Sequence, residues 1–113
     1  MLEKITFDEY QSKTVETAIY PKIGHHVIYP TLGLADEAGE VAGKIKKIFR
    51  DNDGHFDDDR VNAISKELGD VLWYLSQVAT ELGLSLGEIA SENLEKLSDR
   101  KKRNVLKGDG DNR

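Results

Sequence analysis

The apolar residues of this chain recur every three or four positions over most of its length, which is the spacing that gathers them on one face of an α-helix. No stretch shows the alternation typical of a β-strand with one face in water. With roughly 100° between successive helical residues, two segments each place four apolar residues within about 60°. They are Leu34, Val41, Ile45 and Ile48 in the first segment, and Ile64, Val71, Leu75 and Val78 in the second. The pattern predicts an all-α fold.

Capping residues and helix breakers divide the chain into four expected helices. These are predicted over about residues 6–20, 31–50, 58–82 and 85–103. The segment 20–30 carries two prolines and a glycine, so it is predicted to be a loop. Residues 105–113 have no apolar period and are expected to form a flexible C-terminal tail. The chain is therefore predicted to contain a single helical domain over residues 1–104.

The composition argues against several classes of protein. A formal charge of −5 does not suit a nucleic-acid-binding surface, which needs clustered cations. The absence of cysteine excludes disulfides and thiolate zinc sites. No apolar run approaches the roughly 18 residues of a membrane span, and the start MLEKITFDEY does not resemble a signal peptide. We therefore expect a cytoplasmic protein with neither nucleic acid nor membrane as a partner.

The length of the chain also bears on its assembly. A helical chain of 113 residues can bury only a small core by itself. Such chains often finish covering their apolar faces with further copies, so we expect a homodimer or a homotetramer.

Two pairs of acids lie at the margins of the two apolar stripes, in matching positions. Glu37 and Glu40 accompany the first stripe, and Glu67 and Asp70 accompany the second. If the two helices pack as an antiparallel pair, the four carboxylates can converge, as inward-facing acids do in metal sites between bundle helices. Carboxylates held so close together repel one another and need a positive partner. Oxygen ligands of this kind favour Mg²⁺, with Mn²⁺ as a substitute.

A plainer interpretation of the same acids stays open. Acids three residues apart are common on solvated helix faces, where a lysine four residues on, such as Lys44 after Glu40, forms a weak pair. In that case the protein is a non-enzymatic helical interaction module and Mg²⁺ does not stabilise it.

The acids also carry a resemblance to a known family. The stretch DEAGE at 36–40, followed by ELGD at 67–70, resembles the E-E-x-x-E and E-x-x-D signature of the MazG-like all-α nucleoside triphosphate pyrophosphohydrolases. These enzymes are relatives of the dimeric dUTPases and dCTP pyrophosphatases. The likeness spans roughly residues 30–103 and departs from the signature at Asp36, where the family has glutamate.

The resemblance implies a four-helix MazG-like bundle completed by oligomerisation, and an Mg²⁺-dependent hydrolase. Its substrate would be a nucleoside triphosphate, cleaved between the α and β phosphates to give a monophosphate and pyrophosphate. A role in nucleotide-pool house-cleaning is what the family suggests. The metal ligands carried over by position are Glu37, Glu40, Glu67 and Asp70. A phosphoribosyl-ATP pyrophosphohydrolase would use the same acids and remains an alternative.

Further residues are predicted to serve the substrate. Tyr74 shares the angular sector of Glu67 and is expected to line the nucleotide pocket, whereas Trp73 points elsewhere and is expected to pack. Among the acids, Glu40 and Glu67 are expected to be catalytic, with Glu40 the candidate general base. The predicted phosphate-binding residues on the last helix, which share one face within about 60°, are Asn93, Lys96 and Arg100. Weaker candidates for the same work are Lys44, Lys47 and Arg50.

Overall fold

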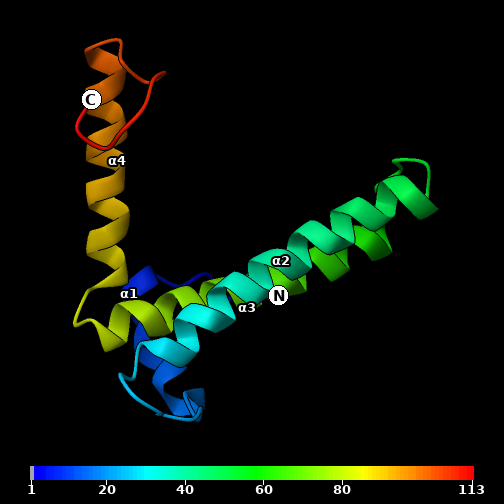
Figure 1. The fold of residues 1–113 in the computed structure, drawn as a ribbon, viewed down its shortest axis with the longest axis horizontal. Coiled ribbons are helices and arrows are strands. Elements are labelled where there is room, and N and C mark those ends of the chain that lie inside the picture. Colours follow the sequence, from blue (N-terminus) through cyan, green and yellow to red (C-terminus); the bar gives the residue numbers. More distant parts are fainter. Residues whose placement is uncertain (1) are drawn as a thin grey trace.

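The computed structural model describes residues 2–113, and within them the chain is all-helical, without strands. This confirms the predicted fold class. Helices α2 and α3 have equal length and run side by side in opposite directions, and they form the largest contact between elements (Figure 1). The elements are α1 (Phe7–Thr14), a short 3₁₀ helix η1 (Val15–Thr17), α2 (Ile28–Asp51), α3 (Asp58–Glu81) and α4 (Leu86–Lys102).

A side chain caps the start of three helices, α1, α3 and α4. The side chains of Thr6 and Ser85 accept hydrogen bonds from the backbone N–H groups of Glu9 and Glu88, both at 3.1 Å. Asp57 accepts one from the backbone N–H of Arg60 at 2.9 Å. Each bond satisfies an N–H group that has no partner within its own helix.

The start of α2 differs from the prediction. The loop expected over 20–30 ends at Val27, and α2 includes Pro30 in its first turn. Proline is tolerated there because the first N–H groups of a helix have no intrahelical acceptor. Pro30 is also fully buried, so it packs in the small core. The proline therefore lies inside the helix that it was expected to precede.

Side chains of α1 form hydrogen bonds with the turn between α3 and α4. The side-chain amide of Gln11 donates to Thr80 Oγ1 at 3.0 Å and to the Leu84 carbonyl at 2.9 Å, while its oxygen accepts from the Leu86 N–H at 2.7 Å. Asp8 accepts from the Ser85 hydroxyl at 2.9 Å. These bonds fix the point at which α4 leaves the α2–α3 pair.

Helix α4 stands away from the α2–α3 pair instead of packing along it (Figure 1). The Cα radius of gyration is 17.0 Å, whereas a compact chain of this length has a radius of about 13 Å. Large apolar side chains on α3 and α4 remain exposed, among them Leu68, Leu75, Leu94 and Leu97. These are the faces that an additional copy would cover in the expected oligomer.

The segment after α4 folds back along that helix (Figure 1). The side chain of Arg113 donates to the carbonyls of Val105 and Leu106 at 3.1 and 3.0 Å. Arg100, which is buried, donates to the carbonyl of Asp111 at 2.7 Å. The flexibility expected for residues 105–113 stays a prediction. None of the helices in the described part of the chain is long and apolar enough to span a membrane.

Candidate metal and nucleotide site

The antiparallel pairing of α2 and α3 brings together three of the acids selected from the sequence. Glu37 on α2 and Glu67 and Asp70 on α3 each offer a carboxylate oxygen, and these oxygens lie within 4.8 Å of one another. Glu37 and Glu67 are partly buried and Asp70 is exposed. Glu40, the fourth acid, is exposed on α2 and lies outside this group.

The electrostatics of this acid cluster show that it lacks positive charge. A hydrogen bond with Glu67, burial and the negative charges of Glu67, Asp70 and Asp36 raise the pKa of Glu37 to about 7. The negative charges around Glu37 therefore disfavour its ionised form. Lys44 partly offsets the charge, with its Nζ 3.9 Å from Glu67. A set of carboxylate oxygens with so little positive charge nearby fits a hard divalent cation.

An aromatic hollow lies on one side of the acid cluster, toward the start of α2. It has a volume of about 210 Å³ and is lined by Tyr29, Leu32, Gly33, Asp36 and Tyr74. Tyr74 lies so close to Gly33 that a Cβ at that position would collide with the tyrosine ring. Burial, followed by the charges of Tyr29 and Glu37, raises the pKa of Tyr74. Tyr74 therefore lies beside the acids, as expected, and Tyr29 joins it.

Trp73 takes the packing position predicted for it. Its indole N–H donates to the Thr17 hydroxyl at 2.9 Å. Its ring meets Tyr74 edge-on at 5.0 Å and Tyr20 edge-on at 6.2 Å. These contacts tie η1 and the loop after it to α3, behind the aromatic hollow.

Tyr10 is a neighbour of the site that the sequence alone did not reveal. Burial, followed by the charge of Asp70, raises the pKa of this phenol. Tyr10 belongs to α1, outside the two helices that carry the acids. Its proximity to Asp70 follows from how α1 crosses α3, which no local pattern encodes.

The chain matches the model of the MazG nucleotide pyrophosphohydrolase domain over residues 29–105. The chain belongs to this family. The match covers α2 from its second residue, all of α3 and α4, and the acid cluster with Asp36 and Glu40. The chain is also 45% identical over 111 residues to the Gene 37 protein of Mycobacterium phage L5, covering 94% of this chain and 97% of that protein. No solved structure gives a significant match to the chain.

The predicted phosphate-binding residues of the MazG domain on α4 lie apart from the acid cluster of the same chain. Asn93 and Lys96 border a hollow on α4, together with Ile89 and Glu92. Arg100 is buried and, with Lys96, faces the carboxylate of Asp111 at 3.6 and 3.5 Å. Because α4 packs mainly against α1 and projects away from α2 and α3 (Figure 1), the chain by itself does not bring these residues to the acids.

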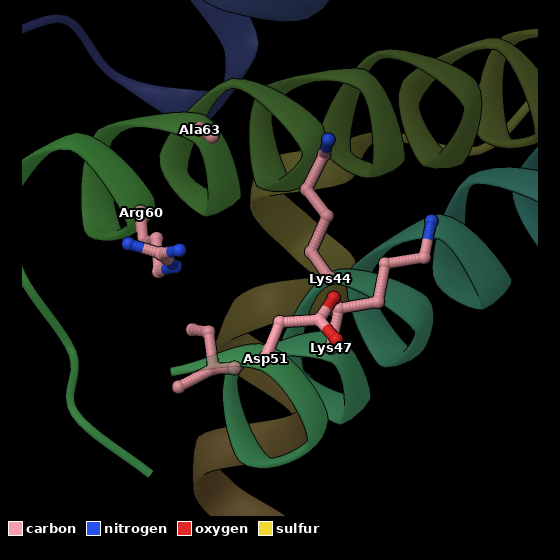
Figure 2. Close-up of a pocket in the computed structure, with 6 residues that line it drawn as sticks. Lys44, Lys47, Asp51, Arg60 and Ala63 are labelled. Carbon is pink, nitrogen blue, oxygen red and sulfur yellow. The ribbon is translucent and has the colours of Figure 1, made fainter. Parts of the chain in front are cut away.

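A cationic hollow lies on the other side of the acid cluster, toward the turn between α2 and α3. Its lining residues, drawn in Figure 2, include Lys44, Lys47 and Asp51 on α2 and Arg60 and Ala63 on α3. The hollow has a volume of about 180 Å³, and the buried Ile48 also lines it. Lys44 and Lys47 were weaker candidates from the sequence, and Arg60 was missed because it precedes the acids of α3 by two helical turns.

Proposed function

We propose that this MazG domain is an Mg²⁺-dependent nucleoside triphosphate pyrophosphohydrolase. It cleaves a nucleoside or deoxynucleoside triphosphate between the α and β phosphates, releasing a monophosphate and pyrophosphate. The observation that carries the proposal is the convergence of Glu37, Glu67 and Asp70, whose oxygens lie within 4.8 Å of one another. A function in clearing unwanted nucleotides is consistent with this reaction.

The residues proposed to hold Mg²⁺ are Glu37, Glu67 and Asp70, with Glu40 at the edge of the group. When bound, the ion supplies positive charge against the phosphates and makes water a stronger acid. Mn²⁺ is the expected substitute because it accepts the same oxygen ligands. The raised pKa of Glu37 supports the assignment, since the protein alone leaves the acid cluster short of positive charge.

Further proposed roles concern proton transfer, substrate binding and the order of the acid cluster. Glu40 is exposed and free to accept a proton from water, so it is the proposed general base. Tyr74 and Tyr29 offer ring faces and hydroxyl groups to the base or sugar of the nucleotide. Glu67 orders the cluster through its contacts with Glu37 and Lys44.

Asn93, Lys96 and Arg100 are proposed to bind the substrate within a homo-oligomer. Because α4 projects from its own acid cluster, these residues would have to act on the site of another copy (Figure 1). The exposed leucines of α3 and α4 support such an assembly, since they offer it an apolar interface. We propose a homodimer or a homotetramer.

The test is pyrophosphate release from a panel of canonical and modified nucleoside triphosphates, measured with Mg²⁺ and with EDTA. Wild type is compared with Glu67→Gln and with Glu95→Gln, a matched control on the exposed part of α4. We expect metal-dependent release that Glu67→Gln abolishes and Glu95→Gln retains. Circular dichroism verifies that both variants fold. Orthophosphate release would place the cleavage at another bond, and no release together with no stabilisation by Mg²⁺ would favour an interaction module.

A further inference from the structure

We propose that the cationic hollow formed by Lys44, Lys47 and Arg60 is the binding site for the pyrophosphate group of the substrate. This assignment rests on the proposed function and adds the orientation in which the nucleotide binds. The nucleotide lies along the α2–α3 pair, with its base toward Tyr29 and Tyr74 and its terminal phosphates toward the turn between the two helices.

The first argument is the order of residue types along both helices. On α2 the chain passes from Asp36 at the aromatic hollow, through Glu37 of the acid cluster, to Lys44 and Lys47. On α3, which runs the other way, the same three zones appear in reverse order, from Arg60 through Glu67 and Asp70 to Tyr74. The aromatic, acidic and cationic zones therefore follow one another in the same spatial order along both helices.

A nucleoside triphosphate has the same three-part order. Its base lies on one side of the α phosphate, and its β and γ phosphates lie on the other. If the acid cluster marks the bond that is cleaved, the aromatic hollow suits the base and the cationic hollow suits the leaving group. The reverse placement would set the most highly charged part of the substrate against Asp36 and the tyrosines.

The second argument is the continuity between the two sites. Lys44 lines the cationic hollow and also reaches to 3.9 Å from Glu67. Ala63 and Arg60 precede Glu67 on α3 by about 6 and 10 Å along the helix axis. The hollow thus begins one helical turn from the acid cluster, so one ligand can reach both.

The third argument is the charge and size of the hollow. Its lining holds three cations and one acid, Asp51, whose carboxylate is bound by Arg50 through two hydrogen bonds of 2.9 and 3.0 Å. Arg60 also pairs with Asp57 at the rim, so part of its charge is already engaged. A volume of about 180 Å³ exceeds that of a single water, which takes about 30 Å³ in the liquid. The buried Ile48 gives the hollow an apolar wall, which weakens dielectric screening.

The experiment compares Lys47→Gln with Lys46→Gln. The two lysines are adjacent and exposed, but only Lys47 lines the hollow. We measure product inhibition by inorganic pyrophosphate and by the nucleoside monophosphate, and binding of inorganic pyrophosphate by calorimetry in Mg²⁺. Lys47→Gln should raise the inhibition constant of pyrophosphate about tenfold, as expected for the loss of one charge-assisted hydrogen bond, and leave that of the monophosphate unchanged. Lys46→Gln should change neither constant.

Arg60→Gln provides a second variant on the opposite helix, and it should also weaken pyrophosphate inhibition. Equal effects of Lys46→Gln and Lys47→Gln would overturn the proposal, because they would indicate long-range charge alone. Unchanged inhibition in both Lys47→Gln and Arg60→Gln would overturn it as well, as would a loss of pyrophosphate binding confined to Lys96→Gln. A wild type that hydrolyses no nucleotide would refute the proposed function instead, while calorimetry with pyrophosphate would still decide whether the hollow binds this anion.

Discussion

Lys44 Nζ lies 3.9 Å from Glu67 Oε1, across the contact between α2 and α3. The lysine side chain is 37% exposed and that of the glutamate 19%, so water screens the pair only in part. A cation that lines the cationic hollow therefore also compensates the acid cluster. In the proposed function, this double contact would make Lys44 a competitor of the metal ion and a partner of the anionic substrate.

We predict that Lys44→Gln separates these two effects. Removing the competing cation should tighten Mg²⁺ binding to the nucleotide-free protein by a few-fold, as suits a partly exposed ion pair. The same change should weaken binding of pyrophosphate. Calorimetric titrations with Mg²⁺ and with pyrophosphate measure both, and Lys44→Arg, which keeps the charge, is the control. Weaker Mg²⁺ binding in Lys44→Gln would contradict the competition.

A pH dependence follows from the raised pKa of Glu37. Its pKa of about 7 in the fold exceeds the ordinary 4.5, so the folded protein binds more protons than the unfolded chain between these values. The metal-free protein should therefore lose stability as the pH rises from about 4.5 through 7. Thermal melts in EDTA over this range test the slope. Glu37→Gln should flatten it, and Mg²⁺ should restore stability mainly above pH 7. A metal-free melting temperature that rises over the range would argue against the raised pKa of Glu37.

Gly33 is predicted to be required for the aromatic hollow. A Cβ at Gly33 would overlap the ring of Tyr74, so Gly33→Ala must displace that ring, at a cost of about 1–3 kcal/mol. The KM for the nucleotide should rise with the loss of the hollow. Gly43→Ala is the matched control on the same helix, because a Cβ there meets no atom within 4 Å. It should raise helix stability by up to about 1 kcal/mol. Equal stability of the two variants in urea titrations would show that the Tyr74 ring moves freely.

Gln77 has no proposed role in the reaction, so it provides a separate test of folding stability. Its side chain is 1% exposed, and in the described part of the chain its amide nitrogen has no hydrogen-bond partner. An unsatisfied buried donor costs about 1–3 kcal/mol. Gln77→Met keeps a similar shape without this donor, so it should increase the free energy of unfolding by about 1 kcal/mol. A destabilised Gln77→Met variant would indicate that the amide has a partner in the assembled protein.

Much of the fold could be predicted because the relevant signals are local. Thr6 and Ser85 mark helix starts through caps that involve residues only three positions away. The predicted helices over residues 31–50 and 58–82 share one pattern of apolar residues. This pattern placed Glu37 and Glu67 at the margins of two stripes that face each other in the structure. Pro30 misled the prediction because its tolerance in a first turn depends on where that turn begins.

The remaining features depend on tertiary packing. The direction of α4 follows from the hydrogen bonds of Gln11 and Asp8, which come from a distant part of the chain. Tyr10 approaches Asp70 from α1, a distant part of the chain, and Tyr29 lines the aromatic hollow from the first turn of α2, which the sequence predicted to be part of a loop. Arg60 lines the same hollow as Lys47 because of the register of α2 against α3, which no spacing within either helix reveals.

The exposed leucines of α3 and α4 have a consequence for the stability of this protein. Leu68 is 53% exposed and Leu94 is 69% exposed, so much of the apolar surface that would stabilise the fold is still in contact with water. A second copy that covers these side chains would subject folding to mass action. The melting temperature would then rise with protein concentration, and each tenfold dilution of a dimer would remove about 1.4 kcal/mol of its stability. The concentration of the chain would then help to set how much of it is folded.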